Sequence, residues 1–449
     1  MTPTKLLLEV PELARAQQTN GTVRIPPGID VPLTARVRRL IDTAAFRRLG
    51  RISQLGLVGQ VYPAANHSRL EHSLGVFHAA IEYVRHLARD PRFASSITPR
   101  DAELFLVAAL LHDVGHWPFC HPIEDIQLPT VPSHEKFARK LLASDEIASA
   151  VREDWQLESD DVANLLAGKV DSATTRILRS MLSGPIDVDK VDYLMRDSLH
   201  AGVPYGRNFD VPRLIGSLCL NEAGDGLAIT EKGKTAAEMM VFARYVMFSE
   251  VYWHHAVRAA TAMLQRAFYD LHREIDLATL FELTDQPMID ELARAGQGRA
   301  AESLLAGLFG PLRQLYKRLA QYSVIESPEL YLRLARRPYP WLCDCAEAFA
   351  RLAGDKLGAR ISPHDVLFDA PPVKLEVEFD VDVYYPKSNA YRRLGDVSPV
   401  VKTLAREQFD NYVKRVRIFV SPRLLVPFNQ LGAVDELVVK AIDETDNTS

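Results

Sequence analysis

The chain has 449 residues, 47% of them apolar and 25% charged, and a formal net charge of -5 at pH 7. This composition is typical of a soluble globular protein, and the length favours one large domain with a smaller lobe. The negative charge excludes general coating of nucleic acid by long-range attraction, so a polyanionic ligand needs a local cationic pocket. No run reaches the ~18 apolar residues of a membrane span. Four scattered cysteines indicate no disulfide framework, and we expect a cytoplasmic protein.

The sequence predicts a mainly α protein with a helical core and a smaller α+β C-terminal lobe. Residues 1–40 are expected to form a strand and turn segment, because residues 21–35 are rich in glycine and proline. Residues 41–345 are expected to form the helical domain, and residues 346–439 the lobe. The polar, acidic residues 440–449 are expected to be a disordered tail.

Helical patterns cover most of the chain, and beyond the N-terminal segment strand patterns lie in its last quarter. The expected helices lie at residues 36–50, around His72 and on through Leu87, at 101–113, several within 132–183, one after Pro185, one long helix at 234–275, and further segments to about residue 357. Residues 373–383 alternate apolar and polar side chains, which is typical of a strand with one solvated face. Residues 414–420 are its expected partner.

Histidines are concentrated in one part of the chain, where eight of the thirteen lie between His67 and His134. A capping-box pattern at residues 98–101 starts an apolar helix, which delivers His112 and Asp113 to its C-terminal end. A glycine and a proline then turn the chain, so further imidazoles fold over the same spot. The resulting cluster is His72, His112, Asp113, His116, His121 and His134.

Imidazole and carboxylate side by side at the end of a rigid helix suit a divalent transition metal such as Mn, Fe, Co, Ni or Zn. A single buried histidine is more often a satisfied core residue, but burying so many titratable groups together without a cation is costly. We therefore interpret the cluster as a metal site. The segment HDVGH resembles the H-E-x-x-H motif of zinc proteases, but glycine and proline break the continuous helix which that motif requires.

A charged helix is expected after Gly184 and Pro185. Counting from Asp189, the side chains of Tyr193 and Asp197 fall on one face, with Lys190 at its edge. A salt-bridged surface helix explains this pattern equally well. The segment therefore becomes informative only together with the first cluster.

These segments resemble a known family. His72, the pair His112 and Asp113, and Asp189 resemble the H…HD…D signature of HD-domain metal-dependent phosphohydrolases. The strings RLEHSLGV, LLHDVGHWPF and IDVDKVDYLMRD are similar to those of the deoxynucleoside triphosphate triphosphohydrolases. The resemblance implies an HD-domain helical core in which these four residues bind one metal ion, with manganese among the candidates and Mg²⁺ on the substrate phosphates. It also implies hydrolysis of a dNTP to deoxynucleoside and triphosphate by metal-activated water.

The resemblance implies roles for the surrounding residues as well. The catalytic and proton-transfer residues would be His116, His121, Glu124, His134 and Glu135. The substrate-binding residues would be Gln54, Leu55, Arg69, Lys190, Tyr193, Asp197, Arg244, Tyr252 and His254, with Tyr193 and Asp197 facing the deoxyribose. Two imidazoles and two carboxylates nearly neutralise a divalent ion and leave positions open for water and a phosphate oxygen.

Control by nucleotide is matched only in part. Asp42 matches the acidic residue of the family's activator site, but the glutamine and arginine partners fall on Arg47 and Gly50. The lobe carries a basic cluster that includes Arg415, which is explained equally well as a solvated face or as a phosphate site at a subunit boundary. We expect a homo-oligomer, a dimer or tetramer, with a nucleotide activator between this lobe and the segment around Asp42 and Arg47.

Two other functions are compatible with the same residues. The chain could act on another phosphate ester, such as a nucleoside monophosphate, a cyclic nucleotide or a nucleic-acid end, or it could bind nucleotide for regulation without turnover. The complete ligand set and the pair of Tyr193 and Asp197 favour the dNTP triphosphohydrolase.

Overall fold

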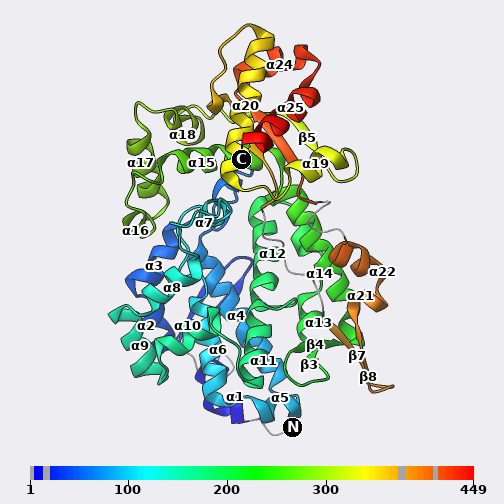
Figure 1. The fold of residues 1–449 in the computed structure, drawn as a ribbon. Helices are drawn as coiled ribbons and strands as arrows, with labels where there is room; N and C mark the ends of the chain where they lie inside the picture. The colour runs from blue at the N-terminus through cyan, green and yellow to red at the C-terminus, as the bar shows by residue number, and fades with distance from the viewer. Residues whose placement is uncertain (1–4, 14–20, 373–380, 408–412, 449) are drawn as a thin grey trace.

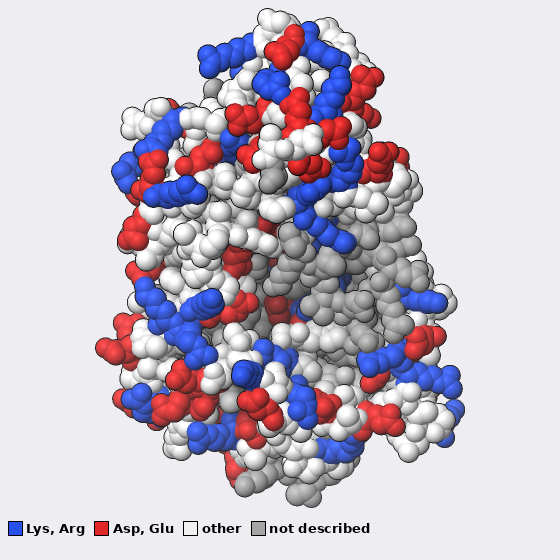
Figure 2. Space-filling model, viewed as in Figure 1, with Lys and Arg blue, Asp and Glu red and all other residues white. Residues whose placement is uncertain are grey.

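The computed structural model describes residues 5–13, 21–372, 381–407 and 413–448. Figure 1 shows a helical body with the N-terminus at its base and a smaller C-terminal lobe above it. Basic and acidic side chains are interspersed over the face seen in Figure 2, with acidic side chains in the hollow near its centre. In the part of the chain described, no helix is both long and apolar enough to cross a membrane.

Helices build the body. In chain order they are α1 (Lys5–Glu9), α2 (Ala35–Ile41), α3 (Ala44–Arg48), α4 (Arg69–Leu87), α5 (Pro91–Ser96), α6 (Pro99–Leu111), α7 (Cys120–Glu124), α8 (His134–Leu142), α9 (Asp145–Trp155), α10 (Ser159–Ala167), α11 (Ala173–Ser183), α12 (Val188–Ala201), α13 (Val211–Ile215), α14 (Lys234–Met247), α15 (His255–Leu271), α16 (Leu277–Leu280), α17 (Asp285–Gly296) and α18 (Ala301–Phe309). The expected capping box is present, because Thr98 and Asp101 satisfy each other's backbone at the start of α6.

Small sheets flank the helices. Where one strand and a turn were expected, β1 (Thr22–Ile25) and β2 (Ile29–Pro32) form a hairpin. The order β3 (Leu218–Leu220), β4 (Leu227–Thr230), β7 (Asp382–Tyr385) and β8 (Ala390–Arg393) defines a sheet on the side of the body, in which only β4 and β7 are parallel. In the lobe, β9 (Val416–Val420) lies between β5 (Lys317–Tyr322) and β6 (Val366–Asp369), antiparallel to both.

The C-terminal lobe has its own apolar core. Its sheet is covered by α19 (Pro328–Leu334), α20 (Tyr339–Leu357), α24 (Leu425–Leu431) and α25 (Val434–Thr448). The short helices α21 (Leu394–Val397) and α22 (Pro399–Val401) instead pack on the body, and Leu394 and Val401 belong to its largest core. The expected boundaries therefore need correction, since residue 345 falls inside α20 and residues 381–404 return to the body.

Two helix predictions were wrong because local contacts interrupt the pattern. The helix expected at 36–50 is divided into α2 and α3 by Thr43, whose side chain accepts a hydrogen bond from the Phe46 N–H as a new N-cap. The helix expected at 234–275 is divided into α14 and α15 at a π-helical turn, Phe248–Tyr252. There the indole of Trp253 donates to the carbonyl of Arg415, and this contact with the lobe overrides helix propensity.

Two predictions for the C-terminal region were also wrong. Residues 373–380 lie outside the described residues, but the end of the expected strand forms β7, which pairs with β4 and β8 rather than with residues 414–420. The expected disordered tail is the end of α25. Its apolar residues, Leu437, Val438, Ala441 and Ile442, repeat with helical spacing and are buried. Acidic residues of the tail also pair with arginines of α19, α20 and the segment between them: Asp443 with Arg333, Asp446 with Arg337 and Glu444 with Arg351.

The feature of the fold that positions the site is the close contact between α4 and α12. Gly75 of α4 faces Asp192 and Arg196 of α12, and a Cβ on Gly75 would lie 2.0 Å from Asp192 Oδ1 and 2.3 Å from Arg196 Nη2. Both side chains are buried and paired with each other at 2.8 Å, so neither can retreat. The absence of a side chain at Gly75 therefore sets how closely the two helices approach.

We predict that Gly75→Ala destabilises the fold. Alanine gains roughly 1 kcal/mol in helix propensity, but displacing a buried ion pair by overpacking costs about 1–3 kcal/mol or more, so the loss should win. Urea unfolding followed by circular dichroism measures the difference. Gly50→Ala is the control, because a Cβ there would meet only the side chain of Leu70, with Cδ1 at 3.4 Å and Cβ at 3.9 Å. Equal stability of the two variants would contradict this account.

Candidate active site

Three helices bring the H…HD…D residues together. His72 lies on α4, His112 caps the C-terminal end of α6 with Asp113 after it, and Asp189 lies in the first turn of α12. The Nε2 atoms of His72 and His112 are 3.3 Å apart, and Asp189 Oδ1 lies 3.0 Å and 3.9 Å from them, respectively. Asp113 Oδ1 lies 3.3 Å from His112 Nε2. His72, His112 and Asp189 therefore converge on one point, and Asp113 borders it beside His112.

The hydrogen bonds of the two imidazoles fix which nitrogen faces that point. Nδ1 of His72 lies 2.8 Å from Asp192 Oδ2, and Nδ1 of His112 lies 2.9 Å from the carbonyl oxygen of Ala109. Because both partners can only accept, each Nδ1 carries a proton and each neutral ring presents the lone pair of Nε2. Burial opposes a charge on His72, but its carboxylate neighbours Asp189 and Asp192 raise its pKa to about 10. Without a cation, a proton is held between the facing groups.

The donor set fits a divalent transition metal. Bonds of about 2.0–2.2 Å place neighbouring ligand atoms roughly 3.0–3.5 Å apart in tetrahedral or octahedral geometry, and most separations in this cluster agree. His72 is 1% exposed and Asp113 4%, so the ligands are held rigidly. The carboxylate of Asp189 is half-buried, which leaves one side of the cluster open. The residues present can therefore hold the metal and leave access for a substrate.

A buried acidic residue that the sequence analysis missed orients His72. Asp192 accepts from His72 Nδ1 and receives two hydrogen bonds of 2.8 Å from Arg196. Arg196 in turn reaches Glu71 at 2.6 Å. A carboxylate behind a metal-binding imidazole fixes its ring and raises its basicity. The only signal in the sequence was the spacing of Asp192, three residues after Asp189 on the helix that also faces the core.

A cationic and imidazole-rich wall adjoins the four ligands. Arg69 Nη1 donates to Asp113 Oδ2 at 2.8 Å, and His116 Nδ1 lies 3.1 Å from Asp113 Oδ1. The rings of His116 and His134 lie with centroids 4.2 Å apart and are tilted by 31°. Gly115 permits this approach, since a Cβ there would lie 2.3 Å from the carbonyl oxygen of His134. Asp113 therefore lies between His112 on one side and the guanidinium of Arg69 on the other.

The surroundings of His134 favour its protonated form, which can act as an acid. Its Nδ1 lies 2.9 Å from Glu124 Oε2, and its backbone N–H donates to Glu124 Oε1 at 2.7 Å. Burial opposes protonation, but the hydrogen bond and charge of Glu124 raise the pKa of His134. His121 is more exposed, with Nδ1 3.8 Å from Glu124, and Glu135 Oε1 lies 3.6 Å from His134 Nε2. The five expected catalytic residues therefore form one group.

The second wall is aromatic and comes from α12 and the break between α14 and α15. Both oxygens of Asp197 are engaged, one by His67 Nε2 at 3.0 Å and the other by the Tyr252 hydroxyl at 2.5 Å. Tyr193 lies one turn before Asp197 and is half-buried. The contact of Asp197 with His67 was missed from the sequence. Asp197 thus holds the wall together through hydrogen bonds to two other elements.

The remaining expected substrate residues differ in how they are placed. Gln54 and Leu55 lie beside the start of α4, where the Gln54 N–H donates to the His67 carbonyl. Arg244 is buried on α14, and His254 is the N-cap of α15. Lys190 Nζ instead donates to Asp187 at 2.6 Å and to the Gly184 carbonyl at 3.1 Å. Lys190 therefore stabilises the start of α12.

The expected regulatory residues do not meet within one chain. Asp42 and Arg47 are exposed at α2 and α3, whereas Arg415 is half-buried before β9 in the lobe. Asp42 borders an open cavity of about 780 Å³, together with Arg38, Arg39, Thr43 and Glu146. Of the basic cluster in the lobe, Lys414 and Arg417 are buried, so these two do not belong to a solvated face.

Comparison with known proteins identifies the family. The model of the HD domain matches residues 69–197, and the model of the HD associated region matches residues 209–434. These matches contain the four residues of the H…HD…D pattern and the aromatic wall. The chain belongs to the HD-domain family, and it resembles the dNTP triphosphohydrolases.

Relatives and solved structures support this assignment. An uncharacterized protein of Methanocaldococcus jannaschii is 31% identical over 380 residues, covering 84% of this chain and 74% of its own. The deoxynucleoside triphosphate triphosphohydrolase SAMHD1 of Gallus gallus is 31% identical over 262 residues, covering 51% of this chain and 42% of SAMHD1. The crystal structure of a hypothetical protein from Aquifex aeolicus has 27% identity and a TM-score of 0.69, covering 91% of this chain and 99% of its own. The chain thus spans less than half of SAMHD1.

We predict that His112→Ala and Asp189→Ala each lose bound metal. Removing either leaves three groups around an ion that needs at least four ligands, while both residues lie near a helix end where alanine preserves the helix. Metal analysis after gel filtration should show stoichiometric Mn²⁺ in the wild type and a large loss in both variants, with unchanged far-ultraviolet circular dichroism. Asp160→Ala, an exposed carboxylate change, should retain the metal. Full metal content in either ligand variant would refute the assignment.

Proposed function

We propose that this chain is a metal-dependent dNTP triphosphohydrolase that produces a deoxynucleoside and inorganic triphosphate. The carrying observation is that the four ligands lie between an imidazole and arginine wall on one side and the Tyr193, Asp197 and Tyr252 wall on the other. One wall suits a triphosphate and the other a sugar. The similarity to SAMHD1 supports the substrate class, and a manganese ion is the proposed resident metal.

The residues divide the reaction into separate tasks. A bound divalent ion supplies Lewis acidity toward a phosphate oxygen and the attacking water. Arg69 and His116 border Asp113 and contact the phosphates. The water oxygen bonds to the α-phosphorus while the bond from that phosphorus to the 5′ oxygen breaks. His134, held protonated by Glu124, gives its proton to the leaving 5′ oxygen, with His121 and Glu135 beside it.

The aromatic wall selects the sugar in this proposal. Tyr193 lies on the same face of α12 as Asp189, so a nucleotide whose α-phosphate meets the metal would bring its sugar beside Tyr193. Asp197, fixed by His67 and Tyr252, supports this wall from behind. A 2′-hydroxyl would meet the Tyr193 ring, so ribonucleotides should be poor substrates. Gln54 and Leu55, with Arg244 and His254, are proposed to border the rest of the nucleotide.

We predict that the four dNTPs and Mn²⁺ yield deoxynucleoside and triphosphate in equal amounts, by ion-exchange chromatography. GTP should react much more slowly than dGTP. Products ending in a nucleoside monophosphate would indicate a different phosphohydrolase, and metal binding without turnover of any dNTP would indicate a regulatory nucleotide-binding module. Equal rates for GTP and dGTP would remove the proposed role of Tyr193. Asp160→Ala serves as the active control.

We also propose a cytoplasmic homo-oligomer, a dimer or tetramer, with an activating nucleotide between Arg415 of one subunit and the Asp42 and Arg47 segment of another. The separation of these residues within one chain requires a second copy for them to meet. Light scattering should show dNTP-dependent assembly, and the rate should rise sigmoidally with dNTP concentration. Arg415→Glu should weaken both effects. A monomer with hyperbolic kinetics that Arg415→Glu leaves unchanged would contradict the proposal.

A further inference from the structure

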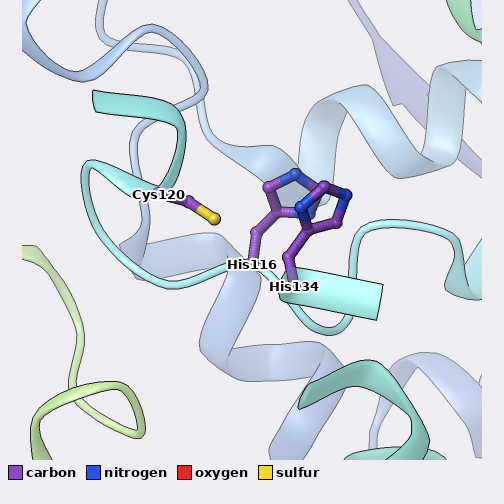
Figure 3. A group of neighbouring side chains, drawn as sticks. All are labelled: His116, Cys120 and His134. Carbon is purple, nitrogen blue, oxygen red and sulfur yellow. The ribbon is translucent and has the colours of Figure 1, made fainter. Parts of the chain in front are cut away.

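Three side chains beside the HD ligands form a second group of potential metal ligands. Figure 3 shows the sulfur of Cys120 turned toward the rings of His116 and His134, and one ligand atom from each residue lies within 4.8 Å of the others. Cys120 begins α7 and His134 begins α8, while His116 lies in the turn after α6. Three separate segments of the chain therefore deliver one ligand each.

The two imidazoles differ in how their Nδ1 atoms are placed. Nδ1 of His134 lies 2.9 Å from Glu124 Oε2, and a carboxylate in this position commonly fixes the ring of a metal-binding histidine and leaves Nε2 for the cation. Nδ1 of His116 lies 3.1 Å from Asp113 Oδ1, but it is a buried nitrogen without a hydrogen-bond partner among the described residues. A bound cation would give the His116 ring a partner that it lacks. Glu135 Oε1 lies 3.6 Å from His134 Nε2, at the edge of this group.

The donor types differ from those of the HD centre. A thiolate with two imidazoles is a softer set than imidazole with carboxylate, and it favours Zn²⁺. Hydrolysis of a phosphate ester by the proposed route has no task for a thiol. A buried cysteine is ordinarily a small apolar residue, and Cys120 does border the apolar cluster that contains Trp117 and Ile123. Its sulfur, however, faces the two imidazoles rather than the interior of that cluster.

The local charge accommodates a dication. The guanidinium groups of Arg69 and Arg48 are positive charges that act on Cys120, and Asp113 pairs with Arg69 at 2.8 Å. Glu124 and a Cys120 thiolate supply two negative charges beside the proposed ion. Cys120 is 1% exposed and His116 4%, so water competes weakly with these ligands. An ion at this position would be both neutralised and desolvated.

We propose that His116, Cys120 and His134 bind a second, thiophilic divalent cation of the Zn²⁺ type, distinct from the HD centre. The ion occupies Nε2 of His134, the nitrogen that proton transfer needs, so Zn²⁺ at this site suppresses turnover. This inhibitory consequence rests on the proposed function, whereas the binding site does not. Cys120 is thereby assigned a role as a ligand through which zinc controls the enzyme.

Cobalt absorption tests the site in the full-length protein. After the HD centre is filled with Mn²⁺, added Co²⁺ should produce one equivalent of thiolate-to-cobalt charge-transfer absorption, and Zn²⁺ should displace it. Cys120→Ser should abolish the band, while Cys219→Ser, a matched change of a half-buried thiol elsewhere, should keep it. No band in the wild type, or a band that persists in Cys120→Ser, would overturn the proposal. Cadmium-113 NMR of the wild type gives the same answer without a variant, because a shift without thiolate character overturns it too.

Inhibition of turnover by Zn²⁺ is measured in a separate experiment. Zn²⁺ in excess over Mn²⁺ should inhibit dNTP hydrolysis, and Cys120→Ser should raise the inhibitory concentration by at least about tenfold, since even outer-shell changes cost metal sites 10–100-fold in affinity. A cobalt band with no inhibition would preserve the site and refute the role of His134 in proton transfer. Inhibition that is equal in Cys120→Ser and wild type would place the inhibitory zinc elsewhere and overturn the regulatory part.

Discussion

The buried carboxylate of Asp192 is the group on which the site depends. It binds His72 Nδ1 on one side and Arg196 on the other, at the point where α4 and α12 approach closely enough to exclude any side chain from Gly75. Removing one partner from such a buried pair typically costs about 3–5 kcal/mol, because the other charge is left uncompensated. The same contact sets the distance between His72 and Asp189. The packing of α4 against α12 therefore also fixes the relative positions of His72 and Asp189.

Asp113 lies between the imidazoles of the site and the guanidinium of Arg69. Its Oδ1 faces His112 and His116, and its Oδ2 accepts from Arg69. Burial opposes ionisation of this carboxyl, but the neighbouring imidazoles and the Arg69 guanidinium hold its pKa well below its usual range. A single carboxylate thus belongs both to the metal ligands and to the phosphate wall. This sharing explains why substrate phosphates would be held in register with the metal, and why the zinc-type group at His116, Cys120 and His134 lies so close by.

The fold and the clustering of the H…HD…D residues were predictable from the sequence to different degrees. His112 and Asp113 lie between the capping box at Thr98 and the turn after Asp113, so local patterns located them, whereas His72 and Asp189 were assigned through the family resemblance. Their role as metal ligands stays a prediction. Asp192, Arg196 and His67 were not predictable, because each acts through a residue far away in the sequence and resembles an ordinary surface charge locally. Lys190 is paired with Asp187, and its phosphate contact, which the resemblance implies, stays a prediction. The tail prediction was wrong because apolar side chains and arginines of the lobe hold α25, and the strand pairing was wrong because β7 pairs with β4 of the body.

The central claim is that water attacks the α-phosphorus of a dNTP and releases the 5′ oxygen. Hydrolysis in ¹⁸O-labelled water, followed by ³¹P NMR and mass spectrometry of both products, tests it most directly. Attack of water at the α-phosphorus should leave one ¹⁸O atom in inorganic triphosphate and none in the deoxynucleoside. Label in the deoxynucleoside, or in pyrophosphate or a nucleoside monophosphate, would show that a different bond is cleaved and would contradict it.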